Sequence, residues 1–179
     1  MTYTVRLESP VGGLLLAARG GALAGVWMEG QKYFPDFSGE EVRDGAGEPV
    51  LLEARRWLEA YFAGERPGPG ALALAPEGSG FRRRVWRRLC DVPYGEVVSY
   101  GEIARELARE RGIESFSAQA VGGAVGHNPI SIIIPCHRVV GTDGNLTGYA
   151  GGVERKLWLL RHEGVDVSGL VVPQKGTAL

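Results

Sequence analysis

The residue types best suited to covalent chemistry stand together at Cys136, His137 and Arg138. An ordinary cysteine thiol has a pKa of about 8.5, so it needs a base or a positive charge nearby to be a nucleophile at neutral pH. The imidazole of His137 can supply the base, and we expect it to hold the Cys136 sulfur ionised. Because neighbouring side chains of an extended chain point to opposite faces, their contact requires a turn or an intervening water.

The chain around this cysteine indicates how it is positioned. Residues 131–134 predict a short buried strand, which Pro135 ends because proline cannot donate to a strand ladder. The second cysteine, Cys90, follows an apolar helix face and has only the acidic Asp91 beside it, which favours a structural role. Two cysteines without a CxxC pair, together with three histidines, predict no disulfide framework, no metal site and no cofactor.

Helical spacing dominates the second half of the chain. Residues 81–89 place an apolar face opposite five arginines, which can bind phosphates or simply form a solvated face. Ser99 and Glu102 have the spacing of a capping box, which predicts a helix that ends at Gly112. A further helix over about 117–126 has little side-chain bulk, so it either packs tightly on a neighbour or admits a bulky partner such as a nucleic-acid backbone. Two short consecutive helices suggest a helix-turn-helix.

The first half of the chain predicts a scaffold. Alternating segments within 3–8, 14–18 and 23–28, joined by glycine-rich turns, predict an antiparallel meander, and apolar residues over 49–62 recur at helical spacing. Proline and glycine are concentrated at 66–70 and 76–80, where we expect a linker. We therefore expect an α+β protein, with a sheet-and-helix domain at 1–80 and a mostly helical domain, containing the helix-turn-helix, at 81–179.

Charge and composition narrow the class of partner. The net charge is −4 up to Gly80 and +3 after it, so affinity for a polyanion is expected in the second domain. With 179 residues and 44% apolar composition, the chain is typical of a globular protein. Its apolar runs are too short for a membrane span, and its first residues lack signal-peptide character, so we expect a cytoplasmic protein that does not bind membranes.

Several motifs, in order, resemble those of the O6-alkylguanine-DNA alkyltransferases. The segment 135–141, Pro-Cys-His-Arg-Val-Val-Gly, resembles the active-site signature of that family. The resemblance spans nearly all of 81–167 and extends through 93–95, 98–100, 120–123, 128–129, 148–152 and 161–164. The first half is similar to the more variable N-terminal domain of the family.

This resemblance implies DNA repair by a suicide transferase, a methylated-DNA--protein-cysteine S-methyltransferase that acts once. O6-alkylguanine in duplex DNA is flipped out of the helix, because the alkyl carbon is walled in by neighbouring bases. The Cys136 thiolate then displaces guanine and keeps the alkyl group as a thioether, which water cannot remove. We expect the protein to be a monomer, which is the simplest oligomeric state.

The resemblance also implies roles for individual residues. His137 takes the thiol proton through a water, Glu163 orients the imidazole, and Asn128 supports the turn. Tyr100 donates its hydroxyl to the departing guanine. DNA and substrate binding are implied for eight further residues: Gln119, Ala120, Gly123, Arg138, Val139, Tyr149, Ala150 and Gly151.

One position departs from the family pattern. Gln119 stands where the family usually carries an arginine that fills the gap left by the flipped base. Losing this cation predicts weaker, less salt-dependent DNA binding with the chemistry retained. The main alternative function is a non-catalytic sensor of alkylated DNA, against which Cys136 argues. A cysteine hydrolase would need an oxyanion site, and a redox-sensing transcription factor is supported only by the helix pair and a thiol.

Overall fold

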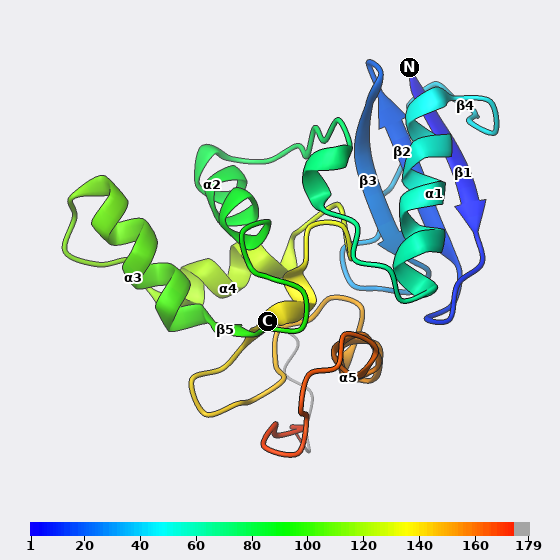
Figure 1. Ribbon diagram of the computed structural model, residues 1–179. Coiled ribbons are helices and arrows are strands. Elements are labelled where there is room, and N and C mark those ends of the chain that lie inside the picture. Colours follow the sequence, from blue (N-terminus) through cyan, green and yellow to red (C-terminus); the bar gives the residue numbers. More distant parts are fainter. Residues whose placement is uncertain (174–179) are drawn as a thin grey trace. The chain divides into compact units, whose positions relative to one another are not determined.

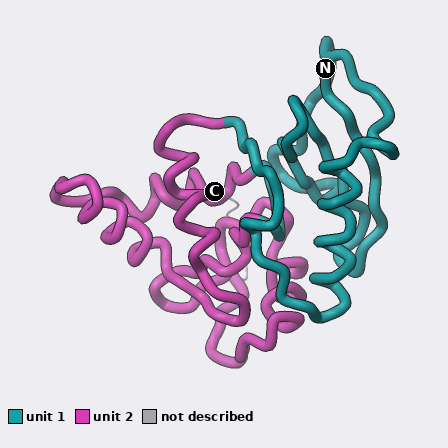
Figure 2. The backbone as a smooth tube through the Cα atoms, turned by 45° about the horizontal axis from the view of Figure 1, so that its top comes forward, with its two compact units in different colours: residues 1–77, 129–133 teal, residues 78–128, 134–179 magenta. Residues whose placement is uncertain are grey.

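The computed structural model describes residues 1–173 and separates into two compact units (Figures 1 and 2). One unit comprises residues 1–77 together with 129–133, and the other comprises 78–128 and the chain from Ile134 onward. The first is built on a small sheet and the second is mostly helical, which confirms the α+β class. The structure adds one feature that the sequence did not indicate: the five residues 129–133 leave the second unit and pack in the first.

The first unit is a four-stranded sheet with one helix. Its strands are β1 (Thr2–Leu7), β2 (Leu14–Arg19), β3 (Ala22–Met28) and β4 (Val42–Asp44), in the order β3-β2-β1-β4. The first three form the expected antiparallel meander, whereas β4 pairs parallel to β1 and was not predicted. Helix α1 (Pro49–Phe62) lies along the sheet (Figure 1). A single 3-10 turn, η1 (Pro69–Ala71), follows it.

Helix α1 begins and packs as its sequence predicts. Proline stands at its first position, where the missing N–H costs nothing. Its buried residues recur three and four positions apart and face the sheet: Val50, Leu51, Ala54, Trp57, Leu58 and Tyr61.

Three helices form the body of the second unit. They are α2 (Gly80–Leu89), α3 (Tyr100–Arg111) and α4 (Ala118–Gly126), and each packs against the other two. The capping box is present, since Ser99 Oγ accepts from the Glu102 amide and Glu102 Oε2 accepts from the Ser99 amide. Gly112 ends α3 in a left-handed conformation with φ of 61°. The indole N–H of Trp86 in α2 donates to the Ala124 carbonyl in α4 at 2.8 Å.

The remaining elements of the second unit surround the cysteine. The 3-10 turn η2 (Cys136–Arg138) leads into β6 (Val139–Val140), which pairs parallel with β5 (Val98–Ser99). Helix α5 (Val153–His162) follows and was not predicted.

The strand expected at 131–134 was wrong. Ile132 has φ of 71°, and residues 131–134 form a buried turn. The isolated bridge to Val26 of β3 is made by Ile130, the residue before this segment. The run of isoleucines has the composition of a buried strand, but this backbone does not have the geometry of one. A short apolar run indicates that the segment is buried and does not determine its backbone conformation.

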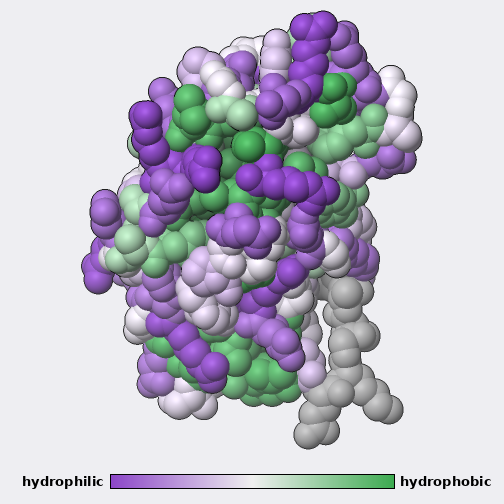
Figure 3. Space-filling view, turned by 90° about the vertical axis from the view of Figure 1, so that its right-hand side faces the viewer, coloured by the Kyte–Doolittle hydropathy of each residue, from purple (hydrophilic) through white to green (hydrophobic). Residues whose placement is uncertain are grey.

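The surface mixes polar and apolar residues, as the composition leads one to expect. On the face that Figure 3 shows, hydrophobic residues reach the surface in several places among charged ones. No helix within residues 1–173 has the length and apolar character needed to cross a bilayer.

A glycine in β3 provides a test of sheet packing. A Cβ at Gly25 would meet the Trp27 ring at 1.8 Å, so the Gly25→Ala variant is expected to lose about 1–3 kcal/mol of stability through overpacking. Gly47→Ala is the matched control, because a Cβ there meets nothing within 4 Å. Chemical denaturation of both variants measures the difference. Equal stabilities would contradict the packing of Trp27 against this strand.

Candidate active site

Asn128 connects the two points where the chain leaves and re-enters the second unit. Its side-chain amide donates to the Ile134 carbonyl at 2.8 Å, across the excursion of residues 129–133. Immediately afterwards, the Cys136 amide donates to the Ile134 carbonyl and the chain turns into η2. Asn128 therefore holds the turn that carries the thiol, and hydrogen bonding from its amide also acts to lower the pKa of Cys136.

The turn brings His137 onto the carboxylate that follows α5. His137 is fully buried, and its Nε2 lies 2.6 Å from Glu163 Oε1. A carboxylate can only accept, so Nε2 carries the proton and Nδ1 is the basic nitrogen of the neutral ring. The contact expected between His137 and Glu163 is thus present, with the imidazole oriented as a base.

Arg138 binds the same carboxylate. Its Nε and Nη2 donate to the two Glu163 oxygens at 2.8 and 3.0 Å, and its Nη1 donates to the Val92 carbonyl at 2.6 Å. The side chain is buried, with its guanidinium 5.7 Å from the Tyr94 ring centroid. Arg138 was expected among the DNA-binding residues, but in this structure its partners are internal, and the guanidinium holds Glu163 in place.

Burial determines the resting protonation of the thiol and the imidazole. It raises the pKa of the Cys136 thiol, and the Asn128 amide and the Lys156 charge offset only part of this rise. Burial also lowers the pKa of His137 below its usual range, despite the adjacent Glu163 carboxylate. Burial thus acts against the ionised sulfur that the sequence led us to expect, and it favours the neutral forms of both the thiol and the imidazole. Burial likewise raises the pKa of Cys90 to about 11, as suits a structural residue.

Lys156 is a member of the site that sequence reasoning missed. It is fully buried in α5, and its ammonium donates to the carbonyls of Val139 and Thr147. Burial lowers its pKa to about 8, while the Cys136 charge acts in the opposite direction. A lysine on the same helix face as the buried Leu159 and Leu160 is the signal that could have identified it, had the helix been predicted.

Two tyrosines complete the polar surroundings of Cys136. Burial raises the pKa of both Tyr100 and Tyr149 well above the ordinary value, so each keeps its hydroxyl proton. The Tyr100 hydroxyl donates to the Thr147 carbonyl at 2.9 Å, and the Tyr149 ring centroid lies 5.9 Å from the Lys156 ammonium. Tyr100 is thus a donor whose present acceptor is a backbone carbonyl.

The other expected binding residues fall into two groups. Gln119 and Ala120 are exposed in the first turn of α4, and a Cβ at Gly123 of the same helix would meet nothing within 4 Å. Internal packing therefore does not require the glycine at 123. Val139 is buried in β6, whereas Ala150 and Gly151 are half-buried between Gly148 and Gly152, whose φ values of 80° and 89° mark turns.

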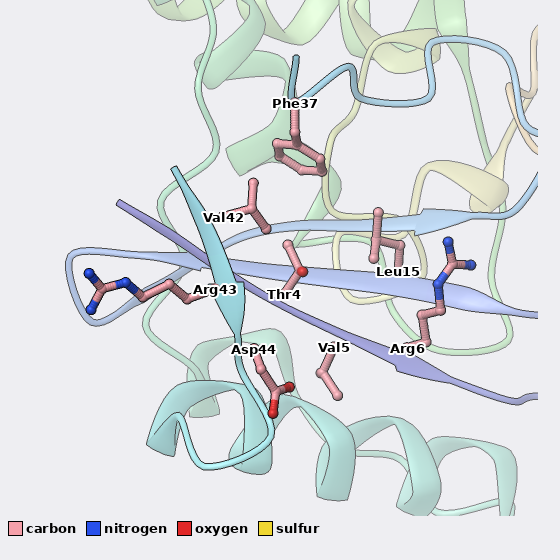
Figure 4. Close-up of a pocket in the computed structure, with 8 residues that line it drawn as sticks. All are labelled: Thr4, Val5, Arg6, Leu15, Phe37, Val42, Arg43 and Asp44. Carbon is pink, nitrogen blue, oxygen red and sulfur yellow. The ribbon is translucent and has the colours of Figure 1, made fainter. Parts of the chain in front are cut away.

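The first unit has a groove of about 550 Å³ beside β4, shown in Figure 4. Arg6 and Arg43 lie at opposite ends of it, and each forms an ion pair, with Glu29 and Glu41 respectively. Its lining contains no cysteine, histidine or serine.

Two family-wide sequence patterns match this chain. Residues 80–165 match the DNA binding domain of 6-O-methylguanine DNA methyltransferase, and residues 1–76 match its ribonuclease-like domain. The chain belongs to the 6-O-methylguanine DNA methyltransferase family. The family expected from the motifs around Cys136 is thereby confirmed.

Relatives within this family match most of the chain. A methylated-DNA--protein-cysteine methyltransferase of Methanosarcina acetivorans is 44% identical over 165 residues, which cover 90% of this chain and 98% of the relative. One of the same name from Mycobacterium leprae is 44% identical and covers 91% and 93% of the two chains. The structure of Mycobacterium tuberculosis OGT in complex with DNA is 42% identical, covers 90% and 93%, and has a TM-score of 0.76.

The pairing of Glu163 predicts how stability depends on pH. Its partners hold the pKa of this buried carboxyl well below the usual range, so its contribution is present above about pH 4.3, the unfolded value, and is lost as pH falls further. Glu163→Gln is expected to cost on the order of 3 kcal/mol near neutral pH, because it leaves Arg138 buried without a countercharge.

Denaturant titrations between pH 7 and pH 2 measure this difference. The gap in unfolding free energy between the native protein and Glu163→Gln should narrow as pH falls below about 4.3. Glu59→Gln, which removes an exposed partner of Arg55, is the control and should change little. A gap of constant size across this range would contradict the assignment.

Proposed function

We propose that this protein repairs DNA by transferring an alkyl group from O6-alkylguanine in a duplex to Cys136, once and irreversibly. The observation that carries the proposal is the placement of the thiol. Cys136 is adjacent in the chain to His137, whose imidazole is oriented by Glu163, and both stand in the part of the chain that matches the DNA binding domain of the family. The relatives are named as methyltransferases of this kind.

In the proposed step, the sulfur forms a bond to the alkyl carbon and the bond from that carbon to O6 breaks. Because burial raises the pKa of the thiol, we expect a base to take its proton as the substrate arrives. The neutral His137 can accept it at Nδ1 through a water, and Glu163 stabilises the resulting imidazolium. The Lys156 ammonium stabilises the thiolate before attack.

The leaving guanine carries the negative charge that the step releases. The Tyr100 hydroxyl retains its proton and is positioned by its bond to the Thr147 carbonyl. When the flipped guanine replaces the Thr147 carbonyl as the acceptor, the Tyr100 hydroxyl donates a hydrogen bond to the leaving group. The product is a thioether without a good leaving group, so the reaction consumes the protein.

Base flipping is proposed to involve the exposed turn of α4. Gln119 projects from this turn, and the open side at Gly123 lets a DNA backbone approach the helix closely. We propose that α3 and α4 act as a helix-turn-helix and that Gln119 occupies the gap left by the flipped base. The pocket walls are proposed to come from Val139 and from 149–151.

The same proposal covers partners and setting. The substrate is double-stranded DNA containing O6-alkylguanine, and a single chain carries every residue named above, in keeping with a monomer. Both cysteines are free thiols, which suits the reducing cytoplasm. The second candidate function is a sensor that binds alkylated DNA without reacting. It is favoured by Gln119, which stands where the family usually carries an arginine.

Intact-mass measurement tests the transfer. After incubation with a duplex containing O6-methylguanine, the protein is expected to gain one methyl group, mapped to Cys136, at no more than one per chain. Cys136→Ala should gain none and still bind the duplex in an anisotropy titration. Unmodified native protein that binds would instead support the sensor.

The charge of Lys156 should be visible in the reactivity of the thiol. Lys156→Met removes the positive charge near Cys136, so the pKa of the thiol should rise and alkylation by iodoacetamide at pH 7 should slow by about tenfold. The slower rate should recover as pH is raised, whereas a misfolded site would stay slow or react without pH dependence. An unchanged pH profile would exclude an electrostatic role.

The effect of residue 119 can be measured by restoring the cation. Gln119→Arg is expected to bind duplex DNA more tightly and to steepen the dependence of affinity on salt by about one unit of slope. Leu52→Arg, at an exposed position of α1, controls for added charge. Equal effects of the two substitutions, or none at 119, would refute this account of Gln119.

A further inference from the structure

A groove of about 350 Å³ lies between α3 and the turn that joins α3 to α4. Arg105 and Arg109, one helical turn apart, form one side, and Ile113, Ser115 and Phe116 of the turn form the other. Glu114 is the acidic member of this lining. The groove therefore combines two cations with an apolar wall and a hydroxyl.

The two arginines are available to an outside partner. Both are exposed, and neither forms an ion pair with any residue in the range 1–173. Arg105 lies near enough to Glu102 to lower the pKa of that carboxyl, but Glu102 Oε2 already accepts from the Ser99 amide in the capping box. Guanidinium groups without internal partners favour an anionic ligand, because they bind phosphate or carboxylate through parallel hydrogen bonds.

A neighbouring groove shows that this arrangement is not general along α3. That groove, of about 420 Å³, is lined by Arg88 and Arg109 but also by Asp91, Glu106 and Glu110. Its acids outnumber its bases, and Arg88 is bound to Glu106. Of these two grooves beside α3, the one on the side of the α3–α4 turn carries the excess of positive charge.

The apolar wall favours one kind of anion. Ile113 is 44% exposed, and the Phe116 ring is held 5.1 Å from the Phe81 ring of α2, measured between centroids. In DNA, each phosphate lies next to a deoxyribose, whose carbon atoms can contact an apolar surface. A free inorganic anion has no apolar part that could contact Ile113 and Phe116. The Ser115 hydroxyl adds a donor suited to a phosphate oxygen.

We infer that this groove binds a backbone phosphate of DNA, with the adjoining sugar against Ile113 and Phe116. The turn that forms the groove leads directly into α4, whose second residue is Gln119. The groove and the first turn of α4 therefore belong to the same pair of helices, so one DNA strand can contact both. Arg105 and Arg109 supply positive charge beside the position where Gln119 supplies none. The inference rests on the proposed function in one respect, namely that this protein binds duplex DNA.

The double variant Arg105→Gln/Arg109→Gln tests the site through counterion release. Affinity for an unmodified duplex is measured by fluorescence anisotropy between about 50 and 300 mM salt. The slope of the logarithm of affinity against the logarithm of salt concentration changes by about 0.9 for each phosphate contact. The variant should bind more weakly, and its slope should fall by about one unit in total, because the two arginines together hold one phosphate. Arg43→Gln/Arg56→Gln removes the same charge from the first unit and should leave the slope nearly unchanged.

Three further readouts separate the outcomes. Transfer of the benzyl group from free O6-benzylguanine to Cys136 should be as fast in the variant as in the native protein, which shows an intact active site. An unchanged slope, an equal loss in the control, or competition by polyglutamate with no change in slope would overturn the phosphate site. If the native protein transfers no methyl group from a methylated duplex, the proposed function fails independently of the slope.

Discussion

A single buried carboxylate organises the reactive end of this protein. The two oxygens of Glu163 accept from four donors: His137 Nε2, the Nε and Nη2 of Arg138, and the Gly95 amide. A carboxylate removed from water is tolerated when it is paired and hydrogen-bonded in this way, and losing any one partner leaves a charge without compensation. The orientation of the imidazole, the burial of Arg138 and the path of the chain at Gly95 therefore depend on one another.

The same burial shifts the pKa of both the thiol and the imidazole. Burial favours the neutral forms of the thiol and the imidazole, because removing a charged group from water costs free energy. Lys156 is the exception, because two carbonyl acceptors keep a cation inside the unit. In the mechanism that we propose, His137 takes the proton of Cys136 beside this cation.

Prediction from sequence succeeded where the determinants are local. The capping box of Ser99 and Glu102 lies within one turn of chain, and the meander follows from alternation between glycine turns. It failed where tertiary contacts decide the backbone. Ile132 adopts a positive φ inside a buried turn, and β4 is a short exposed strand with no alternating pattern. The pairing of Glu163 with His137 was available only through the family resemblance, and Lys156 went unnoticed because α5 was not predicted.

The protonation of His137 is the most direct measure of this account. Long-range ¹H–¹⁵N correlation spectra of the native protein at pH 7 report which ring nitrogen carries the proton. A neutral ring with hydrogen on Nε2, and Nδ1 with the shift of an unprotonated nitrogen, is the expected result. A ring protonated at both nitrogens, or a neutral ring with its hydrogen on Nδ1, would contradict the assignment of His137 as the base that takes the thiol proton.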